Sequence, residues 1–150
     1  MLVKEVMSCS VKTVSSDTRM FDVVSQMCLY RYSGLPVVDS ENQLLGIVAE
    51  KDVLHYLFPT LDDLMNNIAT INMDEMMGKY KDIVHLKVSE LMQSKVITVD
   101  PEMHILKAAS IMVKHRFRRI PVAQDEKLVG MMSLGDVHKA IYQTNIAQMI

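Results

Sequence analysis

Apolar residues recur at helical spacing in two well-separated stretches of the chain, residues 17–31 and 101–115. A short extended segment rich in β-branched residues precedes each stretch, and two short apolar runs separated by a polar turn follow it. Each half of the chain is therefore expected to form the order β-α-β-β-α, which makes an α+β fold. The apolar helical faces are Met20, Val23, Val24, Met27 and Cys28 in the first half and Ile105, Ala108, Ala109 and Met112 in the second.

The boundaries of these elements follow the same pattern in both halves. We expect Ser16 or Asp17 to cap the first helix, and Asp100 to cap its counterpart with Pro101 at the first helical position. Closing helices are expected to begin near Asp52 and near Asp136. The strands are expected over 11–14, 35–38 and 44–48, and again over 96–99, 120–123 and 128–132.

The two halves are copies of one repeat, because identical residues recur 85 positions apart, and 84 apart after the polar turn. We divide the chain into a first repeat, 1–56, a helical insert, 57–87, and a second repeat, 88–150. A three-stranded sheet with two helices is too small to bury both faces alone, so the repeats are expected to pack sheet to sheet, related by a pseudo-twofold axis. The matched landmarks include Met7 and Met92, Val11 and Val96, Thr13 and Thr98, Arg31 and Arg116, Pro36 and Pro121, Gly46 and Gly130, and Asp52 and Asp136.

The insert interrupts the repeat with two expected helices, one capped by Thr60 and starting at Leu61, the other running from Met73 towards His85. Its acids could in principle bind a metal, but no histidine stands at ligand spacing from them, which favours a solvated helical face and no metal site. These acids are Asp62, Asp63, Asp74, Glu75 and Asp82.

Composition narrows the function classes. Of the 150 residues, 49% are hydrophobic and the formal net charge is −2, which argues against wholesale nucleic-acid binding. Cys9 and Cys28 lack CxxC spacing, so we expect unpaired, buried, reduced thiols. The 14 methionines suit core and interface packing better than a copper-binding or calmodulin-like surface. No apolar run could span a bilayer and the N-terminus lacks signal-peptide layout, so a cytoplasmic protein is expected.

Both halves carry a hydrophobic-Pro-Val strand followed by Leu-x-Gly-hydrophobic-hydrophobic-x-x-x-Asp-Val, a pattern that resembles the cystathionine-β-synthase (CBS) domain. Two copies in one chain resemble a tandem CBS pair, or Bateman module. The resemblance implies two clefts between the copies and a disc-like homodimer. It also implies binding of an adenosine-containing regulatory ligand, such as AMP, ADP, ATP or S-adenosylmethionine, with no cofactor required.

The family's ribose-binding signature is similar to Gly-hydrophobic-hydrophobic-(Ser/Thr)-x-x-Asp. The second repeat satisfies it with Gly130, Ser133 and Asp136, whereas the first keeps Asp52 but has Ala49 at the hydroxyl position. A carboxylate at a helix start can accept hydrogen bonds from two ribose hydroxyls, although Ser and Asp there also serve as helix caps. The ligand-binding residues that the resemblance implies are Ser133, Asp136, Thr98, Arg118, Arg119, Ile120 and Pro121, with a less complete second set of Thr13, Leu35, Pro36 and Asp52.

Basic residues precede the middle strand of the second repeat, over 114–119. Arg118 and Arg119 resemble the cations with which family members hold ligand phosphates, and the guanidinium fork suits that task. The alternative is a solvated basic patch that complements the dipole at a helix C-terminus.

The leading functional hypothesis is thus a ligand-sensing regulatory module, with a ligand-free scaffold for dimerisation or partner binding as the alternative. No catalytic arrangement of Ser, His, Asp or Cys and no phosphate-cradling glycine loop is present, so an enzyme is not expected. Five scattered histidines are expected at the surface. Nucleic-acid binding through 114–119 is disfavoured because exposed aromatics are not interleaved with the basic residues.

Overall fold

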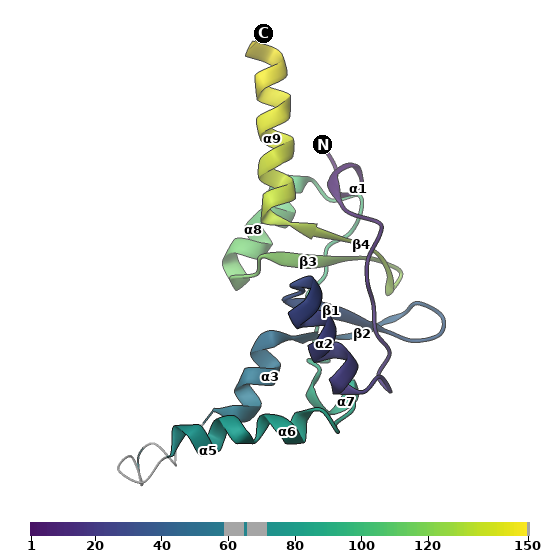
Figure 1. The fold of residues 1–150 in the computed structure, drawn as a ribbon. Helices are drawn as coiled ribbons and strands as arrows, with labels where there is room; N and C mark the ends of the chain where they lie inside the picture. The colour runs from purple at the N-terminus through teal and green to yellow at the C-terminus, as the bar shows by residue number, and fades with distance from the viewer. Residues whose placement is uncertain (59–64, 66–71, 150) are drawn as a thin grey trace. The chain divides into compact units, whose positions relative to one another are not determined.

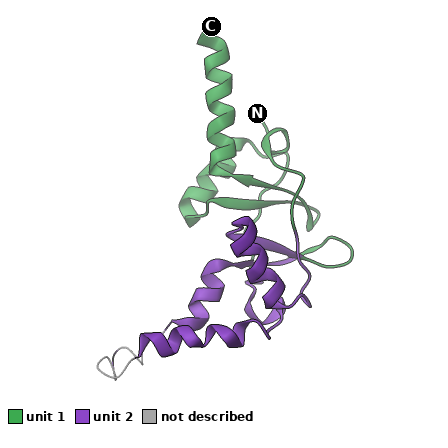
Figure 2. Ribbon diagram, in the orientation of Figure 1, with its two compact units in different colours: residues 1–12, 38–44, 95–150 green, residues 13–37, 45–94 purple. Residues whose placement is uncertain are grey.

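The computed structural model describes residues 1–58, 65 and 72–149 and groups the chain into two compact units (Figures 1 and 2). Unit 1 consists of residues 1–12, 38–44 and 95–150, and unit 2 of residues 13–37 and 45–94. The elements come in the order α1 (Val3–Val6), α2 (Met20–Tyr30), β1 (Gly34–Val38), β2 (Leu44–Ala49), α3 (Glu50–Leu57), α5 (Met73–Gly78), α6 (Tyr80–Ile83), α7 (Val88–Leu91), α8 (Ile105–His115), β3 (Arg119–Gln124), β4 (Lys127–Ser133) and α9 (Leu134–Met149).

The α+β repeat architecture is confirmed, with one two-stranded sheet from each repeat: β1 with β2, and β3 with β4. Strands β3 and β4 are antiparallel, with Arg119 opposite Ser133 at one end, Gln124 opposite Lys127 at the other, and a bulge between Val122 and Ala123. Alternate residues of β4 are buried, as expected for a strand with one face on a core.

The first extended segment of each repeat contributes a single parallel bridge rather than a full strand. Val14 pairs with Val37, and Val99 with Val122. The Val99 N–H donates to the Pro121 carbonyl at 3.1 Å, but the preceding bond of a parallel ladder, to the Ile97 carbonyl, would need an N–H from Pro121 itself. Proline has none, so the ladder cannot extend towards the N-terminus of this segment, and Pro36 limits it in the same way in the first repeat.

The cap predictions for the two long helices are wrong. Helix α2 starts at Met20 after Arg19, and α8 starts at Ile105 after His104, whose Nδ1 accepts from the Leu106 N–H at 3.1 Å. Asp100 instead accepts from the Glu102 N–H at 2.8 Å and forms a turn that precedes the helix. Short polar side chains stabilise such turns as readily as they cap helices, which is why the sequence pattern could not separate the two.

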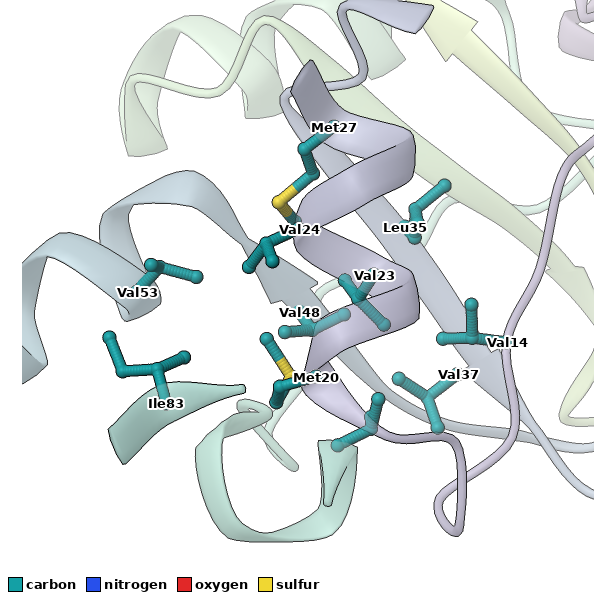
Figure 3. Close-up of a cluster of buried hydrophobic side chains, with 11 residues drawn as sticks. Val14, Met20, Val23, Val24, Met27, Leu35, Val37, Val48, Val53 and Ile83 are labelled. Carbon is teal, nitrogen blue, oxygen red and sulfur yellow. The ribbon is translucent and has the colours of Figure 1, made fainter. Parts of the chain in front are cut away.

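The core of unit 2 packs α2 against the β1–β2 hairpin, α3 and α6 (Figure 3). Figure 3 shows Val53 of α3 and Ile83 of α6 near each other, across from Met20 and Val24 on α2. Tyr80 packs at the edge of this cluster. Helices α5 and α6 confirm the expected helical run from Met73, whereas the helix expected from Thr60 and Leu61 lies outside the described residues.

The prediction that Cys28 belongs to the buried face of its helix is wrong. The side chains of Met20, Val23, Val24 and Met27 are buried, but Cys28 is exposed, and so is Cys9. At 3.6 residues per turn, Cys28 falls at the margin of the stripe that the other four residues define. Both cysteines are free, as expected, but exposed rather than buried.

The core of unit 1 joins α1, α8 and α9 to the β3–β4 hairpin. Val3, Met112, Ile120, Val122 and Met132 have no exposed surface. At the rim, Lys4 Nζ donates to Glu102 Oε1 at 2.7 Å, and this hydrogen bond together with the carboxylate charge raises the pKa of Lys4.

Residues 1–12 and 86–94 each pair with a strand that is distant in sequence. We call these two stretches the leading segments. In unit 1, Ser8 and Met131 exchange two backbone hydrogen bonds of 2.8 and 2.9 Å. In unit 2, Ile47 and Gln93 do the same at 2.9 and 2.8 Å. Residues 1–12 thus lie along β4 of the second hairpin, although the first hairpin follows them in sequence. Residues 86–94 lie along β2 of the first hairpin, although the second hairpin follows them.

This close approach explains the repeated glycine of the Leu-x-Gly pattern. A Cβ at Gly46 would lie 2.6 Å from the Gln93 carbonyl oxygen, and one at Gly130 would lie 2.9 Å from the Ser8 carbonyl oxygen. Neither glycine has a positive φ, so close packing rather than a turn requires the missing side chain.

Candidate functional site

The candidate site of the second repeat is built where β4 ends and α9 begins. Asp136 Oδ2 accepts from the Ser133 N–H at 2.9 Å, and Ser133 Oγ accepts from the Asp136 N–H at 3.0 Å. This reciprocal arrangement caps α9 and fixes the orientation of both side chains. Asp136 Oδ1 receives no hydrogen bond from the described residues, and Asp136 is only partly buried. The capping role and a free carboxylate oxygen therefore coexist in one side chain.

The hairpin brings the other sequence-predicted residues of this set to the same place in unit 1. Arg119 stands opposite Ser133 in the antiparallel register, and the Leu134 N–H donates to the Arg118 carbonyl at 3.0 Å. Thr98 directly precedes Val99, which bonds to the carbonyl of Pro121. Strand β3, the start of α9 and the segment before α8 thus meet at one end of the hairpin.

Burial divides these residues into two kinds. Ile120 and Pro121 are buried, and the Ile120 side chain belongs to the core, so they support the site from within. Arg118 and Arg119 are exposed, whereas Thr98, Ser133 and Asp136 are partly buried. The accessible polar chemistry is therefore a carboxylate, two hydroxyls and two guanidinium groups, which suits a ligand with hydroxyls and an anionic group.

The corresponding place in the first repeat has the same backbone. The Glu50 N–H donates to the Ser33 carbonyl at 2.9 Å, and the Val14 N–H, next to Thr13, donates to the Pro36 carbonyl at 3.0 Å. Leu35 and Pro36 are buried, as their counterparts are.

The carboxylate of the first repeat has different surroundings. Asp52 is only 8% exposed, and its Oδ2 accepts from the Ala49 N–H at 2.8 Å. Its Oδ1 accepts from Gln93 Nε2 at 3.0 Å, so both oxygens are engaged. Sequence reasoning missed Gln93, which is 41 residues from Asp52. The available signal was its position directly after Met92, which matches Met7 and so makes Ser8 the counterpart of Gln93.

Other chemistry is sparse in the part of the chain that the structure describes. There, no three His, Cys, Asp or Glu side chains lie together as a possible metal site, and no helix is long and apolar enough to cross a membrane. All five histidines are exposed, as expected. Of the insert's acids, Asp74, Glu75 and Asp82 lie on the exposed surfaces of α5 and α6, and Asp62 and Asp63 fall outside the described residues.

Comparison with known proteins identifies the family. Residues 3–59 and 88–143 match the CBS domain. The protein MJ1426 of Methanocaldococcus jannaschii is 31% identical over 154 positions, which cover 94% of this chain and 91% of that protein. The crystal structure of CBSX2 of Arabidopsis thaliana in complex with AMP has a TM-score of 0.74 and 25% identity, covering 96% of this chain and 98% of that chain.

A third similar protein shows the fold alone. The CBS domain pair of protein MJ0100, crystallised with 5-methylthioadenosine and S-adenosyl-L-methionine, has a TM-score of 0.67 and 21% identity, covering 96% of this chain and 98% of that chain. The two matched segments carry the two repeats described above. The chain therefore belongs to the CBS domain family, as a tandem CBS pair.

Proposed function

We propose that this CBS pair is a non-catalytic regulatory module that binds an adenosine-containing ligand, AMP, ADP, ATP or S-adenosylmethionine, at the second-repeat site. The observation that carries the proposal is the geometry of Asp136. One oxygen is held by the capping hydrogen bond to Ser133, which fixes the side chain, while the other is open to accept from ribose hydroxyls. Arg118 and Arg119, whose backbone lies next to Leu134 and Ser133, can supply positive charge for a phosphate or carboxylate.

Related proteins support this choice of ligand class. CBSX2 was crystallised with AMP, and the MJ0100 pair with 5-methylthioadenosine and S-adenosyl-L-methionine. All three ligands carry an adenosine moiety with two adjacent ribose hydroxyls. An Asp whose backbone-held carboxylate stands at a helix start is suited to that feature whichever group replaces the phosphate.

The test is titration calorimetry of the purified chain with AMP, ATP and S-adenosylmethionine, alongside melting curves. A ligand at 100 times its Kd should stabilise the protein by about 2.7 kcal/mol. Asp136→Ala removes hydrogen bonds to a charged acceptor worth about 1.5–3 kcal/mol each, so affinity should fall at least about tenfold. Asp136→Asn is the matched control for capping, because its Oδ1 can still accept from the Ser133 N–H while the charge is lost. Binding that is unchanged in both variants would refute the assignment to this site.

We also propose that the module itself turns over no substrate. The side chains assigned to the site are Asp136, Ser133, Thr98, Arg118 and Arg119, and no histidine or cysteine is among them to serve as a nucleophile or base. Incubation of the pure chain with ATP should release no phosphate. Turnover that disappears with Asp136→Ala would overturn this part of the proposal.

A ligand-free scaffold is the second candidate, favoured by exposed apolar side chains on α8 and α9. Leu106, Val113 and Tyr142 are 57%, 65% and 59% exposed. Apolar surface of this kind is typical of association sites, and we propose that it supports a homodimer. Light scattering at tens of micromolar should give twice the chain mass, and Leu106→Glu should shift it towards the monomer. A dimer that binds none of the adenosine ligands would favour this candidate over the sensor.

A cytoplasmic location belongs to the same proposal. Two exposed free thiols, Cys9 and Cys28, persist in the reduced state most readily in the cytoplasm. Fractionation of cells that produce the protein tests it.

A further inference from the structure

The two repeats differ in what occupies the second oxygen of the helix-start aspartate. In unit 2, Gln93 Nε2 donates to Asp52 Oδ1 at 3.0 Å, while the Ala49 N–H holds Oδ2. In unit 1, Asp136 Oδ2 is held in the same way by the Ser133 N–H, and Oδ1 receives nothing from the described residues. The difference comes from a side chain outside both signatures.

Gln93 and Ser8 occupy equivalent places in the two leading segments. Each residue exchanges two backbone hydrogen bonds with the residue that follows the repeated glycine, Gln93 with Ile47 and Ser8 with Met131. The backbone thus presents each side chain to the equivalent side of its own hairpin. The glutamine side chain is long enough to reach the aspartate, whereas the serine hydroxyl is two bonds shorter, and among the described residues it makes no hydrogen bond to Asp136.

We propose that Gln93 is an internal ligand that closes the first-repeat site, so that the chain binds one adenosine ligand rather than two. This inference rests on the proposed function, in which the aspartate accepts from ribose hydroxyls. The Gln93 amide donates to the same carboxylate oxygen that a ribose hydroxyl would use, and it is held there by its backbone bonds to Ile47. A ligand must displace it before it can bind, which lowers the affinity of the first site.

The alternative is that Gln93 only satisfies a nearly buried carboxylate at the start of α3. Asp52 is 8% exposed, and a buried charge is costly without hydrogen-bond partners. That role alone predicts that replacing Gln93 changes stability but not ligand binding. The two roles are therefore separated by a binding measurement.

The first arm of the test opens the closed site in the full chain, with AMP as the probe in titration calorimetry. Asp136→Ala should reduce AMP affinity at least tenfold. Adding Gln93→Ser to Asp136→Ala should restore at least tenfold, which is about 1.4 kcal/mol. A further Asp52→Asn should remove the restored binding. The recovered affinity should stay below that of the natural chain, because Ala49 offers no hydroxyl.

The second arm closes the open site by the reverse exchange. Ser8→Gln should reduce AMP affinity at least tenfold in the otherwise natural chain, and Ser8→Ala, its matched control, should leave affinity unchanged. Ser8 is exposed, so neither substitution requires a rearranged core. Far-UV circular dichroism of every variant verifies that it is folded.

The outcomes distinguish the inference from the proposed function. If the natural chain binds AMP through Asp136 but Gln93→Ser restores nothing and Ser8→Gln costs nothing, the role of Gln93 is wrong and the second-repeat site stands. If AMP binds neither the natural chain nor any variant, the proposed function fails and the inference falls with it. Restoration that Asp52→Asn does not remove also contradicts the inference, because the ligand would then be held elsewhere.

Discussion

Ser133 and Asp136 each accept a hydrogen bond from the backbone N–H of the other, at 3.0 and 2.9 Å. The first repeat has only half of this arrangement: Asp52 accepts from the Ala49 N–H, but Ala49 has no hydroxyl to accept in return. Comparing the two helix starts therefore isolates what one capping hydroxyl contributes to the stability of this fold.

Removing the hydroxyl at Ser133 should lower the stability of the protein, and adding one at Ala49 should raise it. Ser133→Ala leaves the Asp136 N–H without its acceptor and should lower the free energy of unfolding by about 1 kcal/mol. Ala49→Ser should raise it by about 0.5–1 kcal/mol, because the new hydroxyl can accept from the Asp52 N–H. Urea denaturation of both variants is the measurement. A loss of stability in Ala49→Ser would contradict the prediction.

The repeated glycines should tolerate no side chain. Gly46→Ala places a methyl group 2.6 Å from the Gln93 carbonyl oxygen, and overpacking of this kind costs about 1–3 kcal/mol. Gly130→Ala should cost somewhat less, because its shortest contact, 2.7 Å, is with the flexible Met7 sulfur.

Gly78 is the matched control for these substitutions. It ends α5, and a Cβ there would have nothing within 4 Å. Gly78→Ala should therefore raise the unfolding free energy by about 0.5–1 kcal/mol, since alanine favours the helix. Equal melting temperatures for all three variants would show that the leading segments do not pack against the strands as described.

Alkaline pH should destabilise the chain through Tyr80. Partial burial, with a smaller contribution from the neighbouring Cys28, raises the pKa of Tyr80 above its usual value of 10.0. The unfolded chain loses this proton first, so the stabilisation is complete below about pH 10 and is lost as the pH rises through the folded-state pKa. Urea denaturation of the natural chain and Tyr80→Phe at pH 8 and pH 11 should show a smaller loss in the variant. An identical loss would exclude Tyr80 as the cause.

Both thiols should react in the folded protein. Cys9 and Cys28 are free and exposed, so a colourless aromatic disulfide reagent should release two equivalents of coloured thiolate per chain without denaturant. Cys28→Ser should reduce this to one. Reaction that begins only on unfolding would show that Cys28 is buried on the α2 face after all.

The sequence predicted the repeat and the hairpins, because these depend on local periodicity and on motifs a few residues long. The cap at His104 and the exposure of Cys28 were missed for a physical reason. Short polar side chains stabilise turns and helix ends equally well, and a residue at the margin of an apolar stripe can face either way.

Gln93 illustrates the other limit. Its hydrogen bond to Asp52 depends on a leading segment lying along a distant strand, and nothing in the local pattern of residues 86–94 states which strand that is. The alignment of the repeats, which pairs Gln93 with Ser8, is the one signal in the sequence that could have marked this position.

The leading segments also impose an order on biosynthesis. Val3 and Ser8 leave the ribosome long before their partners Met103 and Met131, so residues 1–12 must wait for about a hundred further residues before they can dock. Residues 86–94 wait for nothing, because Thr18 and Ile47 are already made. Unit 2 can therefore close during translation. In unit 1, residues 1–12 are synthesised first but dock only after the rest of the unit has been made.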